Sequence, residues 1–144
     1  MYVKIGGIDQ WVQIRGEDRD NPVILFVRGG PDGSTIPILS GWQSWEKYFT
    51  VVQWDQSGAG RTFRKTGESI ATTMTLARMT QDGVEVAEYL RAHLHKDKIV
   101  LIGHSWGSFL GIQIVKQRPD LFYAFVGTGQ VVGKQTFERQ FELT

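Results

Sequence analysis

The sequence predicts an α/β fold in which a mostly parallel, twisted sheet carries helices on both faces. Short apolar runs, typical of buried strands, alternate with segments that repeat apolar residues at helical spacing. Such alternation is typical of parallel strands joined by crossover helices. The chain opens with a hairpin signal, which adds an antiparallel edge. Its 144 residues, 41% of them hydrophobic, are enough for one core.

The strands are expected in the following order. Two short strands, Tyr2–Ile5 and Ile8–Arg15, are joined by Gly6-Gly7, and both glycines can take the positive φ that a tight hairpin turn requires. Continuous apolar runs then predict buried strands at Val23–Val27, Tyr48–Trp54, Ile99–Ile102 and Leu121–Val126.

Two helices are expected between these strands. The segment from Leu76 to Leu94 repeats apolar residues at helical spacing, and Thr75 is suited to cap its start. A second helix is expected from Ser105 to Gln117. The glycine-rich segment Asp55–Thr62 lacks the glycine and lysine of a phosphate-binding loop. We therefore interpret it as a structural turn over the carboxyl end of the sheet.

The composition excludes several classes of protein. The 16 Lys and Arg are balanced by 15 Asp and Glu, so no basic field is available for nucleic acid. Cysteine is absent, which excludes a disulfide framework and a thiolate metal site, and no cofactor or metal is expected. No apolar run is long enough to span a bilayer or to form a signal peptide. We expect a soluble cytoplasmic protein that binds no membrane.

The motif Gly103-His104-Ser105-Trp106-Gly107 carries the strongest chemical signal. It is a G-x-S-x-G sequence that directly follows a predicted strand and directly opens a predicted helix, which is the context of a nucleophile elbow. Glycine is needed two residues before and after Ser105 because the backbones crowd in so tight a turn. The helix N-terminus adds N–H groups and positive partial charge beside the hydroxyl. Ser105 is the predicted nucleophile; the alternative is an ordinary loop.

A serine nucleophile also needs donors for the oxyanion of the tetrahedral intermediate. One expected donor is the backbone N–H of Trp106, the residue after the nucleophile. The other is expected from the loop after the first buried strand, where Gly30 is the preferred donor and Gly29 the alternative. Gly29, Pro31 and Trp106 are also expected to contact the substrate. The competing interpretation of this loop is an ordinary Gly-Pro turn.

In three segments the sequence resembles the α/β-hydrolase fold family, and specifically its prolyl aminopeptidase (proline iminopeptidase) branch. That branch carries HGGPG, DQRGxGRS and GxSWG, which appear here at Arg28–Asp32, Asp55–Thr62 and Gly103–Gly107. The resemblance extends from the hairpin to about Gly129. It implies a serine hydrolase that cleaves an N-terminal peptide bond or a small ester or amide through an acyl-serine intermediate. The alternative is a non-catalytic binding or interaction module of the same fold.

The chain departs from the branch pattern in two of these motifs. Arg28 replaces the histidine of the first motif, Asp32 replaces its last glycine, and Ser57 replaces the arginine of the second. Because Arg28 ends a central strand, its guanidinium should be partly buried and should need a partner. Asp55, at the end of the strand that the family places alongside, is the expected partner.

The acid and base of a catalytic triad are missing. The triad order in this fold is Ser, then Asp or Glu, then His, yet no histidine follows Ser105. His93 and His95 are expected roughly 20 Å away, at ~3.3 Å per strand residue. His104 adjoins the serine but should leave the turn in another direction, and Asp120 falls at the opposite end of the sheet. The chain by itself should therefore be inactive or very weak.

The resemblance also implies a division of the chain. Residues 1–132 are expected to be the N-terminal part of a hydrolase core, and residues 133–144 the start of a cap that is cut short. The expected partner of the site is a small-molecule or peptide substrate. The strand Leu121–Val126 would be left as an apolar edge, which we expect to pair with a second copy or with the missing C-terminal half.

Overall fold

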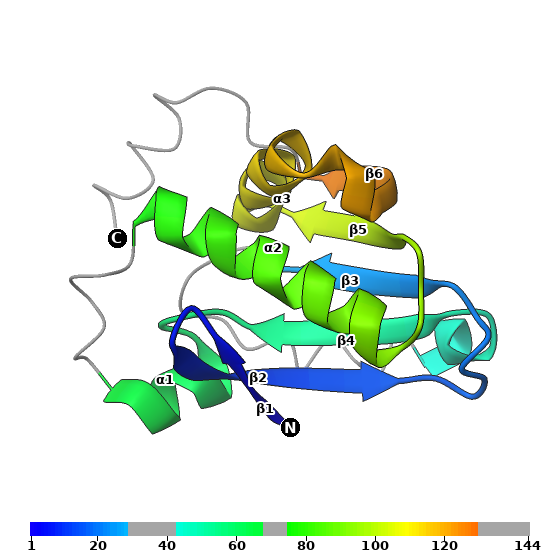
Figure 1. Ribbon diagram of the computed structural model, residues 1–144, viewed down its shortest axis with the longest axis horizontal. Coiled ribbons are helices and arrows are strands. Elements are labelled where there is room, and N and C mark those ends of the chain that lie inside the picture. The colour runs from blue at the N-terminus through cyan, green and yellow to red at the C-terminus, as the bar shows by residue number, and fades with distance from the viewer. Residues whose placement is uncertain (29–42, 68–74, 130–144) are drawn as a thin grey trace.

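The computed structural model describes residues 1–28, 43–67 and 75–129, which form a six-stranded sheet with three helices (Figure 1). The strands are β1 (Tyr2–Ile5), β2 (Ile8–Arg15), β3 (Val23–Val27), β4 (Thr50–Asp55), β5 (Ile99–His104) and β6 (Phe122–Thr128). The helices are α1 (Gly60–Thr66), α2 (Leu76–His93) and α3 (Trp106–Gln117), with short 3-10 helices η2 (Gln43–Lys47) and η4 (Pro119–Leu121).

The sheet has the order β1-β2-β4-β3-β5-β6. Strands β4, β3, β5 and β6 pair in parallel, whereas β1 with β2 and β2 with β4 pair antiparallel. The hairpin turn has the predicted positive φ at both glycines, 59° at Gly6 and 81° at Gly7. The predicted mostly parallel sheet with an antiparallel edge is therefore confirmed. Its parallel strands all end at one edge, where the arrowheads of β3, β4 and β5 lie in Figure 1.

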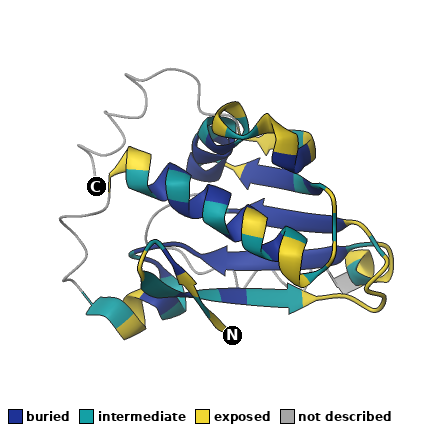
Figure 2. Cartoon of the chain, viewed as in Figure 1, coloured by how far each residue is buried: buried dark blue, intermediate teal, exposed yellow. Residues whose placement is uncertain are grey.

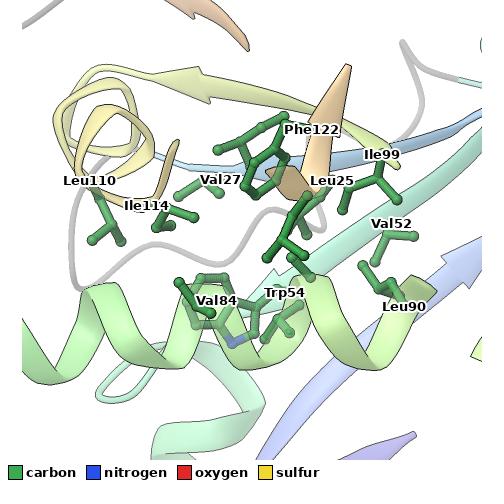
Figure 3. Close-up of a cluster of buried hydrophobic side chains, with 14 of the residues drawn as sticks. Leu25, Val27, Val52, Trp54, Val84, Leu90, Ile99, Leu110, Ile114 and Phe122 are labelled. Atoms are coloured by element: carbon green, nitrogen blue, oxygen red, sulfur yellow. The ribbon is translucent and has the colours of Figure 1, made fainter. Parts of the chain in front are cut away.

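Helices α2 and α3 pack against each other and cover the same face of the sheet. Thr75 caps α2 as predicted, because its side chain accepts a hydrogen bond from the backbone N–H of Arg78. Helices α2 and α3 share one apolar core with the strands. Buried residues are dark blue in Figure 2, and part of this core is drawn as sticks in Figure 3. Val27, Val52 and Leu110 are among its fully buried members. This core fixes the direction in which β5 delivers the chain into α3.

A smaller apolar cluster occupies the opposite face of the sheet. Ile24, Phe26 and Ile102 are buried there, with Phe49 and Val100 packed against them. Because side chains alternate along a strand, these residues lie between the residues of β3 and β5 that belong to the main core. The next positions on this face, at the ends of the parallel strands, are polar.

Several element boundaries differ from the sequence-based expectation. β4 begins at Thr50 rather than Tyr48, because Tyr48 follows η2, bonds back to Trp45 and is 68% exposed. β6 begins after Leu121, which belongs to η4, and both β5 and β6 continue two residues further than predicted. α2 ends at His93, so Leu94 is its C-cap. The longer strands bring His104 and Thr128 into the sheet.

Helix α1 was not predicted, and the interpretation of Asp55–Thr62 as only a turn is wrong at its second half. Residues 56–59 form the turn, and a helix begins at Gly60. This helix has no apolar periodicity, so the sequence gives little sign of it. It is held by polar contacts: the Thr62 hydroxyl donates to the Asp55 backbone carbonyl at 2.5 Å and accepts from the backbone N–H of Trp11 at 2.8 Å.

Two further expectations concern the limits of the fold. The boundary expected between residues 132 and 133, and the cap segment after it, lie outside the described residues. Within the described ranges, no helix combines the length and the apolar character that crossing a bilayer requires.

Candidate active site

Ser105 lies in the turn between β5 and α3 with φ 53° and ψ −120°. In the described part of the chain, only one other non-glycine residue, His95, has a positive φ. This backbone conformation is costly for a residue with a Cβ, and such strain is typical of functional sites. The Ser105 side chain is partly exposed and does not cap α3. The turn therefore presents a hydroxyl at the edge where the parallel strands end.

The two glycines of the motif allow the tight turn, as the sequence predicts. A Cβ added to Gly103 would overlap the carbonyl group of Gly107, and one added to Gly107 would overlap the carbonyl of Val27. Both obstacles are backbone atoms, which cannot move aside like a side-chain end. The start of α3 is therefore packed directly on the ends of β5 and β3.

Hydrogen bonds fix the Ser105 backbone on both sides. Its N–H donates to the carbonyl of Thr128 at 2.9 Å, which ties the turn to β6. Its carbonyl accepts from the N–H and hydroxyl of Ser108, at 2.9 and 2.6 Å, which ties the turn to α3. The serine is thus held by rigid elements rather than by a loose loop, as precise chemistry requires.

The predicted oxyanion donors are only partly described. Trp106 opens α3 directly after the serine, so its backbone N–H belongs to the first turn of the helix. Its side chain is buried and stacks on Phe109 with 5.8 Å between ring centroids. Gly29, Gly30 and Pro31 lie outside the described residues, and their roles stay predictions.

None of the three histidines is hydrogen-bonded to the Ser105 hydroxyl in the described part of the chain. The His104 Nδ1 lies 2.9 Å from the Thr128 Oγ1 on β6. His93 stacks on Tyr89 at the end of α2, and His95 lies in the turn that follows. Asp120 lies before β6 and pairs with Arg118 at 3.0 and 2.9 Å, which lowers the pKa of the Asp120 carboxyl. Among the described residues we find no acid–base pair at Ser105.

The expected ion pair between Arg28 and Asp55 is wrong. The Asp55 carboxylate instead accepts a hydrogen bond of 2.9 Å from the backbone N–H of Arg61 at the start of α1. Burial raises the pKa of Asp55, against the opposing effects of this hydrogen bond and of the charges of Arg61, Arg64 and Arg28. The unpredicted helix α1 supplies a donor within the same turn, and the guanidinium of Arg28 acts on the carboxyl only through its charge.

Thr128 is a site residue that sequence reasoning missed. Its carbonyl and hydroxyl hold Ser105 and His104, although it is far from both in the sequence. Only the register of β5 with β6, in which His104 pairs with Thr128, brings them together. As for metals, the described ranges contain no group of three or more acidic or histidine residues that could hold an ion.

A strained serine in the turn from a parallel strand into a helix, at the carboxyl edge of a mostly parallel sheet, is the arrangement in which α/β hydrolases carry their nucleophile. The sequence also matches the family described as the alpha/beta hydrolase fold over residues 22–142. The chain belongs to this family.

The matching proteins include peptidases and other hydrolases. The chain is 42% identical to the probable aminopeptidase YbaC of Bacillus subtilis (strain 168), over 94% of this chain and 42% of that protein. It is 34% identical to a proline iminopeptidase of Arabidopsis thaliana, over 76% of this chain and 26% of that protein. The chain thus spans less than half the length of these relatives.

Solved structures support the same fold. The epoxide hydrolase VrEH1 of Vigna radiata superposes with a TM-score of 0.73 at 26% identity, over 88% of this chain and 38% of that structure. A proline iminopeptidase-related protein of Thermus thermophilus also has a TM-score of 0.73, at 23% identity, over 88% of this chain and 42% of that structure. Since these neighbours differ in chemistry, the fold alone does not define the substrate.

Proposed function

We propose that Ser105 is the nucleophile of a serine hydrolase that acts on an N-terminal peptide bond or a small ester or amide. The observation that carries the proposal is the positive φ of Ser105 in the turn between β5 and α3. The names of the relatives, a probable aminopeptidase and proline iminopeptidases, favour a peptidase among the serine hydrolases.

In the proposed reaction, the Ser105 oxygen attacks the carbonyl carbon of the substrate while its proton passes to a base. The oxyanion that forms accepts hydrogen bonds from the backbone N–H groups of Trp106 and Gly30. Collapse of this intermediate expels the amine or alcohol, which takes up the proton, and leaves an acyl-serine. Water then attacks the ester, and the carboxylic acid is released with the serine restored.

The described residues supply only part of this machinery. Because no positioned base contacts Ser105 there, its hydroxyl remains a poor nucleophile, and only binding and oxyanion stabilisation would remain. This chain covers 42% and 26% of the two relatives named above, and we propose that a region corresponding to the rest of their length contributes the acid and the base. The 144-residue chain alone should therefore hydrolyse substrates very slowly or not at all.

A fluorophosphonate probe that labels activated serines tests the proposal. A longer chain that continues past Thr144 should be labelled, its Ser105→Ala variant should not, and the 144-residue chain should be labelled far more slowly. Ser44→Ala removes another exposed serine, in η2, and should leave the labelling unchanged. Absence of labelling in every form would contradict the proposal and favour a non-catalytic binding module.

We also propose that the 144-residue chain self-associates through β6. This edge strand has seven residues without a charge, and Tyr123 and Val126 are 65% and 46% exposed. The opposite edge, β1, has only four residues and carries Lys4; short length and charge both protect an edge from pairing. Light scattering should find a dimer or larger species, and Val126→Lys should shift it to monomer. A monomer at high concentration would contradict this.

A further inference from the structure

Three neighbouring strands end in polar residues, and a fourth, β3, is directly followed by one; the four residues lie in one row. His104 on β5 pairs in register with Thr128 on β6. Arg28 follows Val27, which pairs with Gly103, so Arg28 lies beside His104. On its other side, Phe26 pairs with Gln53, so Arg28 lies beside Asp55, two residues further along each strand. From β4 across the sheet to β6, the row therefore contains Asp55, Arg28, His104 and Thr128 in that order.

This polar row lies on the face of the smaller apolar cluster. Phe26 and Ile102 belong to that cluster. Since side chains alternate along a strand, Arg28 and His104, each two residues further, project to the same face. The face thus changes from apolar to polar at the edge where the strands end.

Arg28 in this row is directly beside the strained serine turn. A Cβ added to Gly107 would lie 2.7 Å from the carbonyl oxygen of Arg28, so the Arg28 backbone touches the first turn of α3. Ser105 immediately precedes that turn. Arg28 is therefore a neighbour of the reacting residue in space, although the two are far apart in the sequence.

The Arg28 guanidinium has hydrogen-bonding capacity that its neighbours in the row do not use. It is half-buried and forms no ion pair with a carboxylate in the described ranges. Asp55 accepts from the Arg61 N–H, and the His104 Nδ1 is paired with Thr128. Neither Asp55 nor His104 forms a hydrogen bond or an ion pair with the Arg28 guanidinium in the described ranges, so the guanidinium can bind a further group.

Basic side chains outnumber acidic ones around Asp55 in the described residues. Arg28, Arg61 and Arg64 all lie close enough to the Asp55 carboxyl for their charges to lower its pKa, although burial raises it. Arg61 and Arg64 belong to α1, which begins where β4 ends. An ammonium group brought to this edge would be repelled, whereas a carboxylate would be attracted.

We propose that Arg28 binds a carboxylate of the substrate, so that the site prefers peptides, esters or amides that carry a carboxylate over matched substrates that lack one. A guanidinium can hold a carboxylate through two parallel hydrogen bonds, which lysine cannot do. The inference deepens the proposed function, since it names the substrate class of the same serine site, but the recognition step itself does not require the serine to react.

Equilibrium binding tests this without catalysis. Phenylacetate, phenylacetamide and phenethylamine share an aromatic ring and differ in charge. Titrated into the 144-residue chain and followed by backbone amide NMR, phenylacetate should bind about tenfold more tightly than phenylacetamide at low salt, and phenethylamine most weakly. The largest shifts should fall on residues around Arg28 and Ser105.

Variants assign the preference to Arg28. Arg28→Gln should abolish the preference for phenylacetate, and Arg28→Lys should restore only part of it. Arg19→Gln removes an exposed arginine from the loop before β3, at the other end of the sheet, and should leave the preference intact. Amide spectra of each variant verify that it is folded.

The outcomes separate this inference from the proposed function. Ser105→Ala should keep the preference for phenylacetate while it loses phosphonate labelling. Equal binding of the three ligands, no binding of any, or a preference that survives Arg28→Gln would each overturn the role of Arg28. Labelling of Ser105 in the longer chain would still support the serine hydrolase in those cases.

Discussion

Two turns at the same edge of the sheet lead from a parallel strand into a helix, and they are built differently. In the β5–α3 turn the residue with positive φ is a serine, and the crowding at its glycines comes from backbone atoms. In the β4–α1 turn the residue with positive φ at the helix start is Gly60, and the crowding comes from the Asp55 carboxylate. The first turn leaves the Ser105 side chain partly exposed, whereas the second buries the Asp55 side chain.

The two turns differ in whether their polar side chains hold the turn together or remain available to a ligand. The side chains of Asp55 and Thr62 form hydrogen bonds with backbone groups of the β4–α1 turn and of β2. Ser105 uses only backbone groups to hold its turn, so its hydroxyl is not needed for structure. A serine that is not needed for capping is the one available for reaction.

The largest effect is expected from Gly107→Ala. The new methyl group would overlap the Val27 carbonyl, which the sheet holds in place, so the variant should lose about 3 kcal/mol of unfolding free energy or more. Urea unfolding measures the loss. Gly111→Ala, one turn later in α3, meets the Phe125 ring instead and should cost clearly less, because a ring can shift. Equal losses would contradict the account of backbone crowding.

Gly60→Ala is expected to have the second largest effect. It combines a φ of 50° with overlap on the Asp55 carboxylate, and the expected loss is about 2 kcal/mol. Gly7→Ala is the control, because its φ is 81° in the β1–β2 turn and no atom lies near its added Cβ. It should show the cost of φ alone, about 1 kcal/mol. If both variants lose the same amount, the carboxylate does not crowd Gly60.

The smallest effect is expected in the pH dependence. Burial raises the pKa of Asp55 in the folded chain, so the folded state holds the proton more tightly than the unfolded one. The contribution of Asp55 to stability is therefore complete below its ordinary value of 3.8 and is lost as the pH rises through the folded pKa. Asp55→Asn should flatten this fall in a urea series. An unchanged slope would mean that Asp55 titrates normally.

The elements that could be predicted are those whose signals are local. The hairpin was predictable from two adjacent glycines, β3 from its apolar run, and the strained serine turn from five consecutive residues. Helix α1 could not be predicted, because contacts with β4 and β2 stabilise it rather than an apolar face of its own. The pairing of Asp55 with Arg28 failed for the same reason: a partner from that helix was closer.

The site residues follow the same division. The glycines around Ser105 could be assigned from motif chemistry, because the crowding they relieve arises within the turn and its immediate neighbours. Thr128 and the row that includes Arg28 depend on the register of separate strands. Register follows from how whole strands pack, and a one-residue slip would move every side chain to the other face.

The backbone at Ser105 sets stability against activity. A residue with a Cβ held at φ 53° costs the fold on the order of 1 kcal/mol or more, and a glycine there would avoid that strain. The most stable version of this turn would therefore carry no hydroxyl and could not supply the proposed nucleophile. A glycine at position 105 would therefore be expected to raise the melting temperature of the fold and, at the same time, to remove the proposed nucleophile.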